Sequence, residues 1–520
     1  MKTLSLITAV LVVSNALAFG QVPPVPNAAP AATPEKPAGP PKEEKKDRFL
    51  FVKKVDLYPV SGPSLRGVDI LIKNDKVEAI GENLDVPKGA EILDAAGLRA
   101  YPGMVSLNGD QIIGARTKDQ TNPFGLTSMM GLASGITTVV TGQTAIKITQ
   151  GSVEGSLLRD NLFIGLFYSS QNPRAKVQVR ADLAKAREYL KLLAEFNAKK
   201  AAGDQTAKEP DQRPLGQASR YLPLLRGEVP AVFNVSEAND LIDAAELAQT
   251  FGFRAVMRGA VEGWTVADRL GRAGITCIVS PRARDDADPT TNRPNGSKIE
   301  NAAILHRHGV KVAVCTEKSS IDIDGQAGQD ALYLATDAGM AQRGGLDEDA
   351  ALASVTLEAA RAMGLDDRIG TIEVGKDADI VITDGELLHY ETMVQWAIVN
   401  GRIAYDKQKE TLYRDIRPRA GAKKPEAQWW PRRFAPMADE WRYDPAEEAA
   451  KASSQAATSA SAPTSQPAPG ERGPGRGPRG RMRGDGAGQR PTESRPAESR
   501  PAESRPAESS HTGDGAPEIK

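Results

Sequence analysis

The 520-residue chain carries 66 lysines and arginines against 67 aspartates and glutamates, which gives a formal net charge of −1. This balance excludes nucleic-acid binding driven by the overall charge, because such binding needs a surplus of cations to neutralise phosphates. The length accommodates one large domain of about 250 residues together with smaller units.

The first 18 residues have the pattern of a secretory signal peptide. Lys2 precedes an apolar run from Leu4 to Val13, and Ala16-Leu17-Ala18 fits a cleavage site. The run is shorter than the roughly 20 residues that span a bilayer, so we expect no transmembrane helix. The sequence therefore predicts an exported protein, periplasmic or extracellular, that is cleaved near Ala18.

Residues 19–48 form a Pro/Ala-rich stretch with too few apolar side chains to fold, and we interpret it as a linker. Residues 49–101 contain short β-prone runs at 49–52, 68–72 and 77–80, separated by turn residues such as Asn74-Asp75. This spacing predicts part of a small β-sandwich.

From residue 102 to residue 365, apolar strand-like runs alternate with helical patterns, which is typical of a parallel sheet built from βα units. The expected strands are 135–140, 145–148, 162–167, 229–235, 254–257, 274–280 and 309–315. The expected helices are one capped by Asp182, one at 237–250, and one that Asp347 caps and Gly364 ends. The polar interval 198–213 is expected to form an exposed turn or arm.

Residues 366–407 return to strand patterns, with a hairpin turn at Asn400-Gly401. The two cysteines, Cys277 and Cys315, lie inside strand-like segments, and we interpret them as buried, unreactive thiols. A disulfide between them is the alternative if their strands are neighbours.

Three segments resemble imidazolonepropionase-like amidohydrolases, including exported bacterial relatives. Pro102-Gly103 resembles the entry to their first barrel strand, and residues 359–382 with Asn400-Gly401-Arg402 resemble their C-terminal closure. The resemblance implies an α/β fold: a distorted (β/α)8 TIM barrel at 102–365, beside a β-sandwich formed by 49–101 and 366–407.

The resemblance also implies hydrolysis of amide, lactam or related bonds, with one or two divalent metals at the carboxyl ends of the barrel strands. There a metal-bound water attacks, and an aspartate on the last strand takes its proton. Carried over position by position, the ligand pattern is largely absent. The family's first His-x-His falls on Asn108 and Asp110. The later ligand positions hold Asn234, Ser236 and Gly259, the catalytic aspartate becomes Glu317, and Lys147 falls near the position of a bridging lysine.

The chain contains only four histidines. His306 and His308 form a His-x-His, but at the end of a predicted helix that precedes a strand, where the barrel mouth is not. His389 falls in the C-terminal β unit and His511 in the tail. None of the four is placed to rebuild the family's metal site.

Two hypotheses remain. In the first, the protein is inactive as a hydrolase, needs no cofactor, and serves as a binding or scaffold module for a small molecule or an envelope partner. Asn108, Asp110, Asn234 and Ser236 then line the binding pocket. In the second, it hydrolyses non-peptide carbon–nitrogen bonds of amides or cyclic amides, with Glu317 in the catalytic position. A cation held there by Asn108, Asp110 and Glu317 would be calcium or magnesium rather than the family's zinc, because all three offer oxygen.

Beyond the β unit, residues 408–445 form a Trp/Arg-rich extension that we expect to pack on the domain, with a surface contact as the alternative. Residues 446–520 have the composition of a disordered tail. Its arginines between Arg472 and Arg483 suit contact with an envelope polyanion, although a solvated tether is the simpler interpretation.

Overall fold

The computed structural model describes residues 47–113, 122, 124–318 and 331–417. The signal peptide, nearly all of the linker, most of the Trp/Arg-rich extension, His511 and the tail with Arg472–Arg483 lie outside these residues. The predictions made for them stay predictions.

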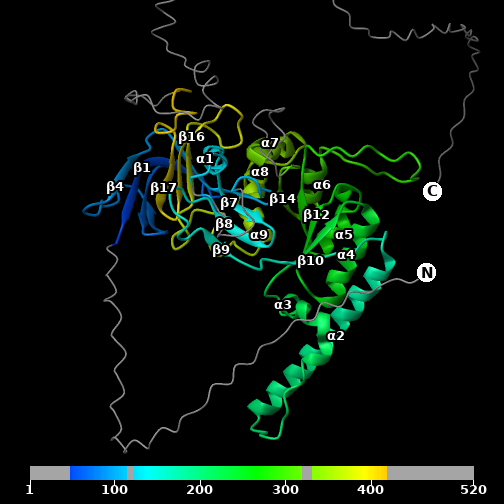
Figure 1. Cartoon of the computed structure of the whole chain (residues 1–520). Helices are drawn as coiled ribbons and strands as arrows, with labels where there is room; N and C mark the ends of the chain where they lie inside the picture. Colours follow the sequence, from blue (N-terminus) through cyan, green and yellow to red (C-terminus); the bar gives the residue numbers. More distant parts are fainter. Residues whose placement is uncertain (1–46, 114–121, 123, 319–330, 418–520) are drawn as a thin grey trace, which may run out of the picture. The chain divides into compact units, whose positions relative to one another are not determined.

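The segments on either side of the central region form one mixed eight-stranded sheet. Figure 1 shows the N-terminal strands (blue) beside the C-terminal ones (yellow). The order is β17-β16-β15-β5-β1-β2-β3, and β4 pairs with β1. The two segments, expected as parts of a β-sandwich, are thus joined by hydrogen bonds into a single sheet. Its strands are β1 (Phe49–Leu57), β2 (Leu65–Lys73), β3 (Lys76–Gly81), β4 (Glu91–Asp94), β5 (Arg99–Pro102), β15 (Ile380–Thr383), β16 (Val394–Val399) and β17 (Arg402–Asp406).

The central region contains two further sheets. The first has the order β6-β7-β8-β9, in which β6 and β7 are parallel while β8 and β9 run back as antiparallel strands. The second is fully parallel, with the order β10-β11-β12-β13-β14. Their bounds are β6 (Met104–Ser106), β7 (Ile136–Thr141), β8 (Thr144–Lys147), β9 (Leu157–Arg159), β10 (Ile164–Leu166), β11 (Ala231–Val235), β12 (Ala255–Gly259), β13 (Thr276–Val279) and β14 (Lys311–Val314).

One apolar cluster joins these two sheets. Alternate residues of a strand point to opposite faces, so each strand contributes one set of side chains to it. Its members from β6, β7 and β11–β14 are Val105, Val140, Val232, Val256, Ile278 and Ala313. We call the face that carries them the inner face. The other side chains of the same strands, such as Phe233 and Met257, belong to a second core beneath the helices.

Helices follow the strands, as expected of βα units. Figure 1 labels most of them beside the parallel sheet. They are α1 (Leu126–Ala133), α2 (Pro173–Ala201), α3 (Leu222–Leu225), α4 (Ala238–Phe251), α5 (Ala267–Arg272), α6 (Asn301–Arg307), α7 (Leu334–Arg343), α8 (Glu348–Val355) and α9 (Leu357–Ala362), with 3-10 turns η2 (Arg213–Tyr221), η3 (Gly263–Thr265) and η4 (Ala331–Tyr333).

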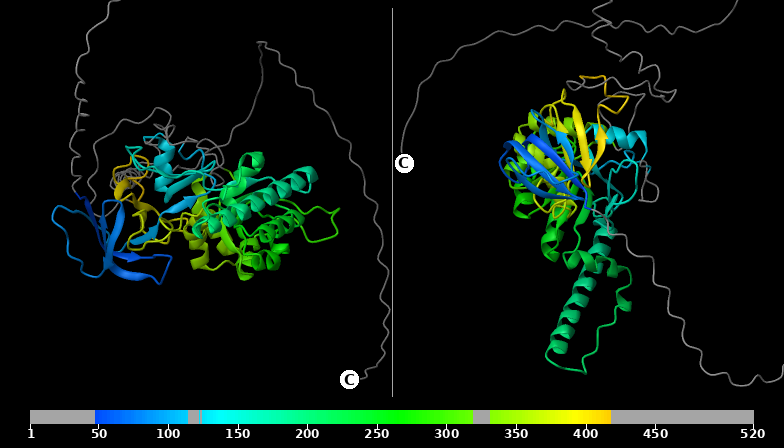
Figure 2. Two further views of the ribbon diagram at one scale, coloured as in Figure 1. Left: turned by 90° about the horizontal axis from the view of Figure 1, so that it is seen from below. Right: turned by 90° about the vertical axis from the view of Figure 1, so that its left-hand side faces the viewer.

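The prediction that Asp182 caps a helix is wrong. Helix α2 begins at Pro173, and the Asn172 side chain caps it by accepting from the Ala175 amide at 3.1 Å. Asp182 lies inside the helix and accepts a hydrogen bond from Gln178. The missed signal was Asn172-Pro173, because asparagine is a preferred cap and proline is favoured in the first turn. Figure 2 shows the long helix and the segment that returns beside it.

Asp347 does cap a helix, accepting from the Ala350 amide at 2.9 Å. The predicted single helix is, however, interrupted at Thr356, whose φ of −122° and ψ of −90° are not helical. The Thr356 hydroxyl donates to the Leu352 carbonyl, and this local bond competes with the helical ladder.

Both cysteines are buried and free. Their strands are neighbours, but Cys277 pairs in register with Val312, and the two thiols belong to different apolar clusters. The alternative of a disulfide between them is therefore wrong. Within the part of the chain that the structure describes, no helix is long and apolar enough to cross a membrane.

Candidate functional site at the carboxyl ends of the parallel strands

The inner face becomes polar one step beyond its apolar layer. The residues two positions after Val256 and Val232 are Arg258 and Asn234, which are also partners in register. By alternation they point to the same face. We call the carboxyl ends of β6 and β10–β14, with the residues that follow each strand, the carboxyl edge.

Arg258 reaches across this edge. Its guanidinium donates to the Leu107 carbonyl, just beyond β6, at 3.2 Å, so it links the two central sheets. Its Nε atom is buried and has no hydrogen-bond partner. An unsatisfied buried donor costs about 1–3 kcal/mol, so the structure holds this guanidinium at the edge at an energetic cost.

On the neighbouring strands of the same face, β10 carries a position that faces open space. Gly165 is exposed although it is paired with Val232, and a Cβ added to it would meet no atom within 4 Å. Phe167 follows on the same face and is 68% exposed. An exposed aromatic ring on the same face as a guanidinium is an arrangement suited to a ligand with a flat or apolar part and a negative group.

Asn108, in the first predicted ligand position, has a structural task. Its side-chain amide donates to the backbone carbonyls of Thr316 and Glu317, at 3.0 and 3.2 Å. These bonds tie the end of β6 to the end of β14. The amide nitrogen is therefore committed, and only the carbonyl oxygen of this side chain remains as a donor for a cation.

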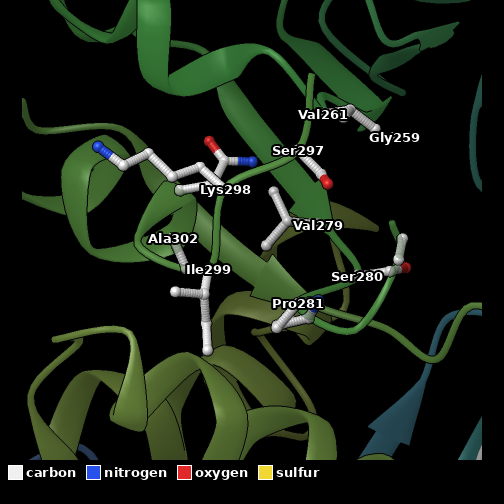
Figure 3. Close-up of a pocket in the computed structure, with 11 residues that line it drawn as sticks. Gly259, Val261, Val279, Ser280, Pro281, Ser297, Lys298, Ile299 and Ala302 are labelled. Carbon is white, nitrogen blue, oxygen red and sulfur yellow. The ribbon is translucent and has the colours of Figure 1, made fainter. Parts of the chain in front are cut away.

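Gly259 ends β12 and lines a small pocket with Val279 and Ser280, which Figure 3 shows. Its φ is +102°, in the region that favours glycine. A Cβ there would lie 3.1 Å from the Ser236 hydroxyl and 3.2 Å from the Val235 carbonyl oxygen. The pocket holds about 20 Å³, room for roughly one water molecule. The backbone here is thus built for a residue without a side chain.

The remaining predicted positions also lie at the carboxyl edge. Asn234, Ser236 and Glu317 are exposed, and Asp110 is half-buried. Among the described residues, no group of three or more His, Cys, Asp or Glu side chains is arranged to hold a metal ion. The structure thus places the predicted residues along one edge without showing that they converge on one point.

Two side-chain pairs that were not predicted complete this edge. Arg282, after β13, makes a two-pronged ion pair with the fully buried Asp337 of α7, at 2.7 and 2.8 Å. Burial raises the pKa of Asp337 despite this partner. The Ser280 hydroxyl lies 3.2 Å from the Cys315 thiol, and burial raises the pKa of that thiol. Because the thiolate is the nucleophilic form, Cys315 is suited to packing rather than to covalent catalysis.

Lys147 is not at the carboxyl edge. It is fully buried, and its ammonium contacts Asp377 at 2.6 Å, Asp379 at 2.8 Å and the Asn400 side chain at 2.7 Å. All three partners belong to the C-terminal β unit. The lysine therefore fastens β8 to the eight-stranded sheet, which is the structural role that a lone lysine on a strand usually has.

The loop between β13 and α6 is held by Glu262. Its carboxylate accepts from the amides of Ala238 and Gly296, at 2.8 and 3.2 Å, and from Arg293 at 2.7 Å. Burial opposes the charge, but these donors together lower the pKa of Glu262. This carboxylate is thus committed to positioning a loop beside the carboxyl edge.

The three histidines among the described residues lie away from this edge, as predicted. His306 and His308 are exposed at the end of α6, which leads into the amino end of β14. His306 lies 3.6 Å from Asp347. His389 stacks on Tyr390 in the C-terminal unit.

Sequence reasoning missed Arg258, Phe167 and the Arg282–Asp337 pair. For Arg258 a signal existed: a charged residue two positions after Val256 in an apolar strand must share its face. For Arg282 and Asp337 there was none, because 55 positions separate partners that only the fold brings together.

Comparisons with known proteins agree with this architecture. The amidohydrolase family matches residues 260–414. An imidazolonepropionase from Mesorhizobium japonicum is 32% identical over 158 residues, which cover 30% of this chain and 36% of that protein. One from Brucella anthropi is 29% identical over 174 residues, or 31% of this chain and 40% of that protein. The chain thus matches well under half the length of these relatives.

A solved amidohydrolase from Thermotoga maritima matches 69% of this chain and 100% of its own, with a TM-score of 0.53 and 24% identity. This likeness concerns the fold alone and fits an α/β, TIM-barrel-like architecture. Residues 260–414 of this chain are thus similar to the amidohydrolase family. The curated relatives that match about 30% of the chain are imidazolonepropionases.

Proposed function

We propose that this protein binds a small anionic molecule at the carboxyl edge without a metal ion, as a binding or scaffold module rather than a hydrolase. The observation that carries the proposal is Arg258. It is a positive charge held on the inner face by its bond to the Leu107 carbonyl, and the open position at Gly165 lies on the same face two strands away, on β10. A guanidinium offers paired donors that match a carboxylate or phosphate.

The side chains of the edge do not fit the divalent cation of the superfamily. Arg258 would repel it, Gly259 has no room for a ligating side chain, and the Asn108 amide faces two carbonyls. Metal affinity in proteins depends on several donors fixed around one point, and the first-choice donors are missing here. The proposed role for Asn108 is to hold β6 against β14, while Arg258 and Phe167 contact the ligand.

One observation favours the second candidate, a hydrolase acting on amides or cyclic amides. Within the described residues, the carboxylates of Asp110 and Glu317 have no hydrogen bond or ion pair. They remain available as bases or as oxygen donors for calcium or magnesium.

Elemental analysis of the purified protein, with a hydrolysis screen on cyclic amides and dipeptides in the presence of added zinc, calcium or magnesium, separates the two candidates. We expect substoichiometric metal and no turnover. Stoichiometric metal together with turnover that Glu317→Gln abolishes would overturn the proposal.

Binding is tested by calorimetric titration of the full chain with a panel of small aromatic and aliphatic carboxylates and their neutral amides. We expect the acids to bind and Arg258→Gln to weaken binding about tenfold to hundredfold, because a charge-assisted hydrogen bond contributes about 1.5–3 kcal/mol. The matched control is Arg254→Gln, an exposed arginine just before the same strand, which should leave affinity unchanged. Equal loss in both variants would contradict a specific role for Arg258.

Export is a further part of the proposal, motivated by the pattern that ends at Ala18. N-terminal sequencing of protein recovered outside the cytoplasm should begin just after this residue. An intact N-terminus in that fraction would contradict cleavage there.

A further inference from the structure

A second, larger pocket lies among three loops that the proposed function does not use. These are the β2–β3 turn, the β8–β9 loop and the β16–β17 turn. The pocket has a volume of about 540 Å³, which falls within the roughly 300–1,000 Å³ of small-molecule sites. Its lining includes Arg48, Asn74, Ser152, Arg368, Asn400 and Arg402.

This pocket is separate from the carboxyl edge. Strand β8 runs antiparallel to β7, so the loop that follows Lys147 returns to the amino end of β7. The Ile148 amide accordingly donates to the Thr137 carbonyl at the beginning of that strand, at 2.8 Å. A ligand here would not meet Arg258.

Two tight turns form one wall and pack directly on each other. Asn400 and Gly401 both have positive φ, +50° and +65°, as the two-residue hairpin turn requires. A Cβ on Gly401 would lie 2.2 Å from the Asn74 carbonyl oxygen, so only glycine allows this approach. Arg48 bridges the turns, donating to the carbonyls of Asn74 at 2.6 Å and Asn400 at 3.0 Å.

The Asn400 side chain fixes the opposite wall. Its oxygen accepts from the buried Lys147 at 2.7 Å, and its nitrogen donates to the Gly155 carbonyl at 2.9 Å. The β8–β9 loop is therefore anchored to the same buried charges that hold the two units together. Such a preformed pocket needs little ordering when a ligand binds.

Positive charge faces this space. Arg48 and Arg402 are close enough that Arg402, together with burial, lowers the pKa of Arg48. The buried Nε of Arg48 has no partner, and no ion pair is formed by Arg402 within the described residues. Arg368 differs, because its charge is offset by Asp377 at 2.7 Å. The acids that also line the pocket are Asp75 and Glu154.

The lining carries three cations, Arg48, Arg368 and Arg402, against two acids, Asp75 and Glu154. Behind it, the buried Lys147 lies between Asp377 and Asp379, and Asp377 also pairs with the more exposed Lys76.

We propose that this pocket is a second binding site, for a small molecule with a carboxylate or phosphate group that Arg48 and Arg402 bind together. An oxyanion supplies acceptors to both guanidiniums and offsets the repulsion between them. The hydroxyl and amide groups of the lining, including Ser152, are placed for the uncharged part of such a ligand.

Calorimetric titration of the full chain with succinate, glycerol 3-phosphate, inorganic phosphate and neutral glycerol tests this site. We expect at least one of the two organic anions to bind, glycerol not to bind, and added salt to weaken binding. Preference for succinate or for glycerol 3-phosphate identifies the anionic group, and binding of inorganic phosphate alone would contradict an organic ligand.

Arg402→Gln is the variant of choice, because this side chain is exposed and its loss should leave the fold intact. It should weaken binding at least tenfold, whereas Arg66→Gln, an exposed arginine on β2, should not. Phenylglyoxal labelling read by mass spectrometry should show ligand protection of Arg402. Arg258→Gln should leave this binding unchanged, so the proposals for the two sites are tested independently. No binding of either organic anion at millimolar concentration, or unchanged binding by Arg402→Gln, would overturn the proposal.

Discussion

Replacing Lys147 by methionine tests whether buried charges fasten the central region to the eight-stranded sheet. The side chain volume is nearly kept, but Asp377 and Asp379, whose side chains are 0% and 4% exposed, lose their common cation. Removing one partner of a buried ion pair costs about 3–5 kcal/mol, because the remaining charge is left uncompensated in a poorly solvated place. For a domain of this size we expect a fall in Tm of roughly 5–10 °C.

Urea and thermal unfolding followed by circular dichroism measure the loss. The matched control is Lys73→Met on β2 of the eight-stranded sheet, whose exposed pair with Asp47 should matter little. The double variant Lys147→Met/Asp379→Asn should recover part of the stability, because one of the two uncompensated carboxylates is then neutral. A loss below about 1 kcal/mol for Lys147→Met would refute this reasoning and mean that Lys76 and Arg368 neutralise the acids by themselves.

Three further predictions concern backbone strain, loop anchoring and pH. Gly259→Ala should destabilise the protein by about 1–3 kcal/mol, because the φ of Gly259 is +102°. Gly165→Ala is the control: a Cβ there would meet no atom within 4 Å, so the unfolding midpoint should change little. Equal effects of the two substitutions on the unfolding midpoint would contradict the argument from strain. Glu262→Gln should speed tryptic cleavage between Arg284 and Lys298, since the amide nitrogen cannot accept from Gly296 or Arg293, and an unchanged cleavage rate would count against the anchoring role. Burial opposes ionisation of Asp377, but Lys147 and its other donors hold the pKa of this carboxylate below its usual value. The stability that the ionised carboxylate contributes to the fold is therefore complete above about pH 4. It is lost as the pH falls through the lower pKa of the folded state. Asp377→Asn should therefore be less stable at neutral pH and depend less steeply on pH below 4, as acid titration of the unfolding midpoint will show.

Much of the fold could be predicted from the sequence because its signals are local. Alternating apolar runs placed the parallel strands, Asn400-Gly401 marked a hairpin turn, and Asp347 marked a helix start. Each depends on a few adjacent residues whose backbone preferences agree with the final structure. The prediction that Asp182 caps a helix failed because it also rested on a local signal. An acidic residue before an apolar helix face resembles a cap even when it lies inside the helix.

The candidate site, too, has a part that the sequence predicts and a part that only the tertiary structure decides. The sequence by itself determined the residue types at Asn108, Gly259 and Glu317, and the resemblance predicts that these positions correspond to the family's ligand positions. Only the tertiary structure decided what these residues do, because their partners are distant in the chain: Asn108 bonds to carbonyls 208 and 209 positions away, and Lys147 pairs with an acid 230 positions away. Hydrogen bonds and buried charges depend on distance in space, and a linear pattern does not contain that distance. The inward direction of Arg258 was within reach of the sequence, but its link to Leu107 required both central sheets to be in place.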